Sequence, residues 1–326
     1  MLIYAGIDEA GYGPLLGPLC VACSHWSIEG ASDPLAPPNL WKTLSRAVCR
    51  TSKDRRGRIA INDSKKLKGN GENGVHPMRT IERGVLAALS LQSNVDALYT
   101  DSELFTRVGA SDPSTIAPWY CESTALPWAC DAPQIQIACA MLRRAAIDAS
   151  VAGHGMTCLT TDADEINEAA RQGMVKTSVP WTLLIQQVTQ LRARWPDAAI
   201  RVAADRQSGR MRYLDDLLRA FPNDRLKVIQ EDLRESVYQI DSAKASMVIS
   251  FTVGGEMDHL PIALASMTAK YVRELWMDRM NRWFAARVTN LAPTAGYVKD
   301  GRRFVGLIRP ALVASGLDES KLIRTI

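Results

Sequence analysis

The chain has 326 residues, of which 47% are hydrophobic and 23% are charged, and its formal net charge is +4. This composition supports a sizeable folded core and excludes disordered, collagenous and low-complexity chains. No apolar run reaches the ~18 residues that a membrane span needs. Asp8 and Glu9 fall where the apolar segment of a secretory signal peptide would have to continue. We therefore expect a cytoplasmic protein that makes no membrane contact. The mild positive charge permits a polyanionic partner without requiring one.

Seven cysteines are scattered along the chain, and only Cys20 and Cys23 form a C-x-x-C pair. No second pair follows at the spacing of a zinc finger. We therefore expect reduced, buried thiols rather than a metal site or a disulfide framework.

The predicted elements alternate between strands and helices. Apolar, β-prone runs predict strands at 2–7 and 19–28, and helical spacing predicts a helix over 78–92. Residues 106–157 contain four prolines and clustered aromatic side chains, and we interpret them as an insertion or small subdomain with a helix at 134–149. The remaining predictions are helices at 162–170 and 181–194, strands at 198–205, 226–230 and 245–253, and one long helix over 262–288.

This alternation predicts an α/β fold, with helices packed on the faces of a sheet. The sequence is interpreted as one domain over 1–326, with a helical C-terminal part over 262–326. Its oligomeric state stays open.

Carboxylates stand at or just beyond the ends of three predicted strands. Asp8 and Glu9 follow the first strand, Asp205 ends a later one, and Glu256 follows the strand at 245–253. Crevices at strand ends are common sites in α/β folds. Four clustered carboxylates repel one another, and divalent cations are the usual compensation. Because no histidine or cysteine cluster accompanies these oxygens, they favour Mg²⁺ or Mn²⁺, and two such ions can promote phosphodiester hydrolysis.

Several motifs occur in one order along the chain. They are GIDEAGYGPLLGP at 6–18, DSKKL at 63–67, VAAD at 202–205, ASMTAKYVRE at 265–274 and GY at 296–297. Together they resemble the motifs of the type 2 ribonucleases H, the HII/HIII family. The resemblance covers roughly 1–100 and 160–300, and 106–157 is unmatched.

The resemblance implies a ribonuclease H-like mixed sheet flanked by helices, with an inserted segment and C-terminal helices. It also implies a metal-dependent endonuclease that cuts the RNA strand of RNA–DNA hybrids, leaving 5′-phosphate and 3′-hydroxyl ends. The acids that it implies as catalytic residues and as ligands of two Mg²⁺ or Mn²⁺ ions are Asp8, Glu9, Asp205 and Glu256. A gap-free count back from Lys270 favours Glu256 over Asp258 as the fourth acid.

Further residues are expected to bind the nucleic acid. The Gly11-Tyr12-Gly13 loop is the part that the family uses to sense a ribose 2′-hydroxyl. The other candidates are Ser64 and Lys65 before the first helix, Ser266 and Lys270 on one face of the long helix, and Tyr297 for stacking on a sugar. For Lys65, Lys270 and Tyr297, an ordinary surface, ion-pairing or packing role is the alternative.

The sequence departs from the family pattern at two places. Tyr12 replaces the basic residue usual between the two glycines, and Lys299, Arg302 and Arg303 stand where the family has histidine motifs. These departures leave open the choice between long hybrids and a single ribonucleotide embedded in DNA. The alternative functions are a non-catalytic nucleic-acid-binding relative, and a phosphodiesterase acting on another nucleic-acid structure.

Overall fold

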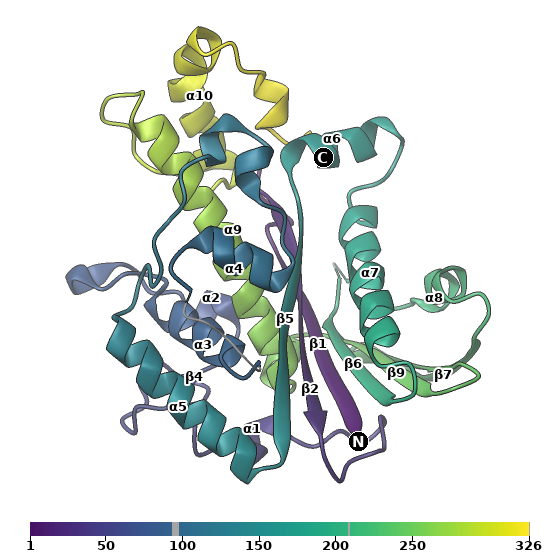
Figure 1. The fold of residues 1–326 in the computed structure, drawn as a ribbon. Helices are drawn as coiled ribbons and strands as arrows, with labels where there is room; N and C mark the ends of the chain where they lie inside the picture. Colours follow the sequence, from purple (N-terminus) through teal and green to yellow (C-terminus); the bar gives the residue numbers. More distant parts are fainter. Residues whose placement is uncertain (93–97, 208, 326) are drawn as a thin grey trace.

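A central sheet of seven strands organises the molecule (Figure 1). The computed structural model describes residues 1–92, 98–207 and 209–325. In spatial order the strands are β5 (Val151–Thr161), β2 (Leu19–Ile28), β1 (Leu2–Ala10), β6 (Ala199–Asp205), β9 (Ser246–Thr252), β8 (Glu235–Asp241) and β7 (Arg225–Glu231). A separate parallel pair joins β3 (Val48–Cys49) to β4 (Ile59–Ala60).

The three middle strands of the sheet run parallel. β1 pairs with β6, and β6 pairs with β9, whereas the outer pairs are antiparallel. The register sets Ile7 beside Ala204 and Asp205 beside Thr252. Parallel strands have their carboxyl ends at one edge, so the residues that follow β1, β6 and β9 lie close together.

Helices cover both faces of the sheet (Figure 1). Successive strand residues point to opposite faces, so Tyr4 packs on one side while Ile3 and Ala5 pack on the other. The face beneath Tyr4 carries α3 (Arg79–Leu89), α4 (Asp101–Val108), α5 (Ala132–Asp148) and α9 (Leu260–Ala285). The opposite face carries α7 (Ser178–Arg194) and α8 (Leu214–Ala220). The remaining helices are α1 (Leu40–Thr43), α2 (Ser64–Leu67), α6 (Ala163–Arg171) and α10 (Val298–Ala314).

The long helix α9 packs directly against β1. A side chain at Gly6 would place its Cβ 2.1 Å from the backbone nitrogen of Ile262, so only glycine permits this approach. Ala263, Ala265 and Ala269 of the same helix are fully buried in the core. Pro261 occupies the first turn of the helix, where its missing N–H has no intrahelical partner to lose. This crossing fixes the start of α9 beside the middle of β1.

The α/β class expected from the sequence, a mixed sheet flanked by helices, is confirmed. The strands and helices predicted from the sequence are present within a few residues of their expected ends. The structure adds the strands β5 and β8 to the main sheet and the helices α4 and α8, none of which the sequence analysis identified. Residues 106–157 contribute α5 and most of β5, both packed into the main core, while their interpretation as an insertion stays a prediction.

The seven cysteines are free thiols, and Cys20, Cys23, Cys49 and Cys158 are buried as expected. Cys121 is exposed, and Cys130 and Cys139 are half-buried, so burial is not general. Within the described ranges, no helix has both the length and the apolar composition of a bilayer crossing.

Candidate active site

A pocket of about 320 Å³ lies where β1, β6 and β9 end. Its lining includes every residue that the sequence proposes for the site: Asp8, Glu9, Gly11, Tyr12, Gly13, Ser64, Lys65, Asp205, Glu256, Ser266, Lys270 and Tyr297. Ala10, Pro14 and Asp63 complete it. Segments from both halves of the chain therefore meet at one place, while the roles assigned to these residues stay predictions.

The sheet and its connections position the four acids. Asp8 and Glu9 are near the carboxyl end of β1, where Asp8 is 6% exposed and accepts a hydrogen bond from the Glu9 backbone N–H at 2.7 Å. Asp205 is the last residue of β6 and accepts a hydrogen bond from the Gly255 N–H at 3.2 Å. Glu256 follows β9 in a short 3₁₀ turn, Gly255–Met257. A left-handed residue, Gly254, makes the reversal into that turn.

Burial and mutual repulsion raise the pKa values of these acids. Burial raises the pKa of Asp8 well above its ordinary range, and the charges of Glu9, Asp205 and Glu256 add to the rise. Burial, followed by repulsion from Asp205, raises the pKa of Glu9 to about 7. The pKa values of Asp205 and Glu256 are also raised, again mainly by burial. The pocket therefore concentrates negative charge that would be stabilised by a bound cation.

Two lysines line the pocket, and they differ in how their charge is used. The charge of Lys65 partly offsets the rise in the pKa values of Glu9, Asp205 and Glu256, so it acts on the acidic cluster. The Nζ of Lys270 lies 2.6 Å from a carboxylate oxygen of Glu274, one turn along α9. This is the helix ion pair considered as the alternative for Lys270, and it coexists with a place in the pocket lining.

Two buried serines join α2 to α9 at the base of the pocket. The hydroxyls of Ser266 and Ser64 share a hydrogen bond of 3.2 Å. A hydrogen bond from Ser266 also opposes the rise in the pKa of Asp8. Asp63 caps α2 by accepting from the Lys65 backbone N–H at 2.9 Å. The serines therefore belong to the support of the acids as well as to the pocket surface.

The two candidates for the fourth acid separate clearly. Glu256 lines the pocket, whereas Asp258 pairs with Arg234 at 2.8 Å and does not line it. Lys299, Arg302 and Arg303 fall in α10 and are not part of the lining either. Arg303 instead pairs with Asp300 at 2.8 Å.

Two pocket-side residues were missed by the sequence analysis. Asp63 lines the pocket and contributes to the raised pKa values of Asp205 and Glu256, and its place at the start of the DSKKL motif was the available signal. Lys176 places its Nζ 5.2 Å from the ring centre of Tyr12. It brings a positive charge to the loop where Tyr12 replaces a basic residue, and no sequence motif marked it.

The acids do not form a ready coordination sphere. Among residues 1–92, 98–207 and 209–325, no three His, Cys, Asp or Glu side chains have an arrangement that could hold one metal ion. The case for a cation therefore depends on the charge and the oxygen chemistry of the four acids. Both fit Mg²⁺ or Mn²⁺.

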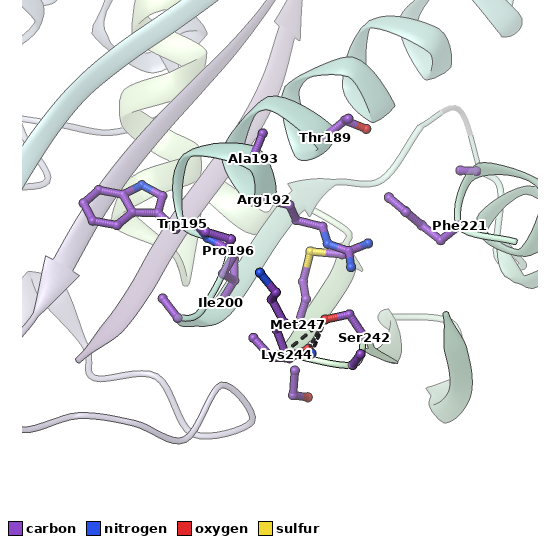
Figure 2. A pocket seen from close by; sticks show the side chains of 15 residues that line it. Thr189, Arg192, Ala193, Trp195, Pro196, Ile200, Phe221, Ser242, Lys244 and Met247 are labelled. Atoms are coloured by element: carbon purple, nitrogen blue, oxygen red, sulfur yellow. Dashed lines mark hydrogen bonds between the residues drawn. The ribbon is translucent and has the colours of Figure 1, made fainter. Parts of the chain in front are cut away.

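A second cavity, of about 550 Å³, lies at the opposite ends of β6 and β9 (Figure 2). Ile200 and Met247 lie near the starts of β6 and β9 and contribute to its wall. Its lining includes Arg192 and Lys244 but no carboxylate, and Arg192 is paired with Asp224 at 2.6 Å. With no acid or base placed for hydrolysis, this cavity is not the candidate active site.

Comparisons with known proteins gave structural neighbours only. No family model and no curated protein matches the chain. A solved ribonuclease HII from Archaeoglobus fulgidus, in complex with PCNA, is 15% identical, with 99% of this chain and 94% of that chain covered and a TM-score of 0.44. Bst-RNase HIII in complex with Mn²⁺ is 16% identical, with coverages of 100% and 66% and a TM-score of 0.43. Ribonuclease H2 from Pyrococcus horikoshii OT3 is 13% identical, with coverages of 98% and 92% and a TM-score of 0.41. At these values the likeness concerns the fold alone and carries no assignment of activity.

Proposed function

We propose that this chain is a metal-dependent endonuclease that hydrolyses the RNA strand of RNA–DNA hybrids. The observation that carries the proposal is the meeting of Asp8, Glu9, Asp205 and Glu256 in one pocket with the glycine-rich loop at 11–13. Crowded, partly buried carboxylates with raised pKa values are typical of functional sites.

Two Mg²⁺ or Mn²⁺ ions would be held by the four acids, which supply only hard oxygen donors. Such ions, when bound, would activate a water and neutralise the charge that develops on the phosphate. The acids' own part is to stay ionised at neutral pH, which a bound cation favours by lowering their raised pKa values.

Other pocket residues suit the recognition of a nucleic acid strand. The backbone N–H groups of Tyr12 and Gly13 make no hydrogen bond within the part of the chain that the structure describes, although both residues line the pocket. They can therefore donate to a ribose hydroxyl or a phosphate oxygen. Lys65 can contact a phosphate, and the ring of Tyr297, which is 54% exposed, can stack on a sugar.

Cleavage of a labelled hybrid, resolved on a gel with Mg²⁺ or Mn²⁺, tests the proposal. The wild type should cut the RNA strand, and Asp8→Asn should lose this activity. Asp258→Asn is the matched control, because Asp258 carries the same side chain outside the pocket. It should retain wild-type activity.

Two other results would select the alternatives. Hybrid binding without cleavage under either metal indicates a non-catalytic nucleic-acid-binding relative. Equal cleavage of single-stranded RNA or duplex RNA indicates a phosphodiesterase of broader or different specificity. A duplex with one ribonucleotide, included on the same gel, measures the preference between embedded and continuous RNA.

A further inference from the structure

A buried arginine far along the chain holds the glycine-rich loop from behind. Arg324 is 4% exposed, and its guanidinium donates to the carbonyl oxygens of Gly11 and Gly17 and, at 3.4 Å, to that of Pro14. Its backbone N–H donates to the Leu15 carbonyl at 3.0 Å. One residue therefore contacts the loop at four successive points between 11 and 17.

Among residues 1–92, 98–207 and 209–325, no carboxylate pairs with this cation. Within the described residues, no acidic side chain lies within 4.0 Å of Arg324. Burial and the neighbouring charge of Arg273 lower the pKa of its guanidinium. A buried charge without a counter-ion is costly unless dipoles solvate it, so the loop carbonyls must stay turned toward Arg324.

A second buried arginine fixes the other end of the loop. Arg273 of α9 donates to the carbonyl of Pro18 at 2.6 Å and to that of Leu16 at 2.9 Å. The Gly296 carbonyl accepts from the backbone N–H of Leu15 at 2.7 Å. With these groups paired, the N–H groups of Tyr12 and Gly13 are among those that make no hydrogen bond to the described residues, and both residues line the pocket.

The segment that carries Arg324 is itself anchored to α6. The Asn167 side chain, 2% exposed, donates to the carbonyls of Ser320 and Ile323 at 2.9 and 2.7 Å. The same side chain accepts from the Thr325 backbone N–H at 2.7 Å. Leu16 also pairs with Ile323 in a β-bridge. The guanidinium is therefore presented to the loop by a segment whose position is set by the folded core.

We infer that Arg324 is a positioning residue for substrate selection: by holding the carbonyls of Gly11, Pro14 and Gly17 inward, it keeps the Tyr12 and Gly13 N–H groups directed to the nucleic acid. This inference rests on the proposed function. It assigns the preference for ribose over deoxyribose partly to a residue that lies outside the pocket lining.

The test compares Arg324→Met and Arg324→Lys with the wild type, with Arg309→Met as the matched control. Arg309 lies in α10, is mostly exposed and pairs with Glu319, and it makes no hydrogen bond to the described residues of the loop. The KM and kcat for a hybrid are measured, together with the affinities for a hybrid and a DNA duplex in an Asp8→Asn background. Thermal unfolding checks that each variant is folded.

Arg324→Met should weaken hybrid affinity and raise KM by about tenfold, the size of one lost hydrogen bond, with little change in affinity for the DNA duplex. Arg324→Lys keeps the charge but cannot reach all of the carbonyls. Its hybrid affinity and KM should therefore lie between those of the wild type and Arg324→Met. Arg309→Met should match the wild type. If Arg324→Met does not fold, Arg324→Lys gives the same comparison.

An unchanged ratio of hybrid to DNA affinity in the folded Arg324 variants would overturn the inference while leaving the proposed function intact. Equal losses for the hybrid and the DNA duplex would also overturn it, because a general structural role gives that result. A wild type that does not cleave or prefer the hybrid overturns the proposed function, and the inference with it.

Discussion

The crowding of acids in the pocket predicts that removing one charge stabilises the metal-free protein. Burial and the charge of Asp205 raise the pKa of Glu9 from 4.5 to about 7, despite the opposing effect of Lys65. The native state therefore holds the Glu9 proton more tightly than the unfolded chain does. The contribution of protonated Glu9 to the free energy of unfolding is full below pH 4.5 and is lost as the pH rises through about 7.

The size of the effect follows from the pKa difference. Each unit corresponds to about 1.4 kcal/mol, so ionised Glu9 destabilises the native state by about 3 kcal/mol at alkaline pH. Glu9→Gln removes this charge and keeps a side chain of similar shape. The variant should be about 3 kcal/mol more stable than the wild type at about pH 8, and close to it at about pH 4.

Urea unfolding with a chelator present, at both pH values, measures this difference. Glu29→Gln is the matched control, because Glu29 is exposed and its replacement should change stability by less than about 0.5 kcal/mol. Added Mn²⁺ should stabilise the wild type more than Glu9→Gln, since the ion compensates the same charge. Equal stabilities of the wild type and Glu9→Gln at about pH 8 would refute the reasoning, because the acids would then not be crowded in the native state.

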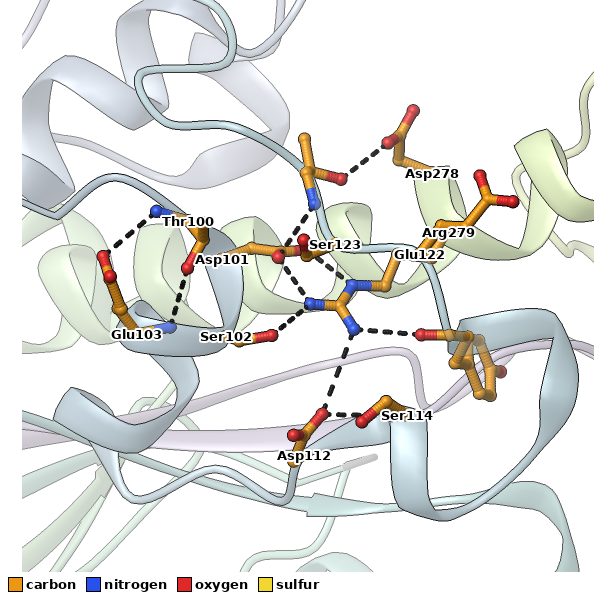
Figure 3. Close-up of polar contacts among 12 residues, drawn as sticks. Thr100, Asp101, Ser102, Glu103, Asp112, Ser114, Glu122, Ser123, Asp278 and Arg279 are labelled. Carbon is orange, nitrogen blue, oxygen red and sulfur yellow. Dashed lines mark hydrogen bonds and ion pairs between the residues drawn. The ribbon is translucent and has the colours of Figure 1, made fainter.

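Three further predictions concern the core and the pocket. Arg279→Met should lower stability by about 3–5 kcal/mol in thermal or urea unfolding, because it strands the fully buried carboxylate of Asp101 (Figure 3). A loss below about 1 kcal/mol would show that the pair is hydrated. Gly6→Ala should cost about 3 kcal/mol or more, since its Cβ would meet the backbone of α9, and wild-type stability would mean that the helix can shift. Asp205→Asn should weaken Mn²⁺ binding in calorimetry by at least about tenfold. Asp258→Asn should leave Mn²⁺ affinity unchanged. Equal losses of Mn²⁺ affinity in the two variants would count against a metal site in the pocket.

Local sequence patterns determined the main elements of the fold. The run at 2–7 is apolar and the run at 19–28 is mostly apolar, because β1 and β2 are buried on both faces, and they were identified for that reason. The long helix was marked by Pro261 and its apolar length. β5 was missed because its glycines and polar residues break the alternation, and its place in the sheet comes from pairing with β2. β8 was missed because it is bounded by Glu235 and Asp241 and has further polar residues between them.

The site was partly visible in the sequence because its acids stand at strand ends, and parallel strands bring those ends together. The motifs added the glycine loop and the serines. The choice of Glu256 over Asp258 was favoured by a count along the chain, and the turn after β9 gives each a different direction.

Only the tertiary structure decided how these groups are supported and charged. Arg324 and Gly11 are separated by 313 positions, and no local pattern could indicate that one guanidinium binds the loop carbonyls. The raised pKa values have the same origin, because burial and repulsion depend on distances through space. The sequence determined which chemical groups are present and which elements carry them. The packing of those elements determined which groups face one another, since contacts between distant segments are set by the whole fold.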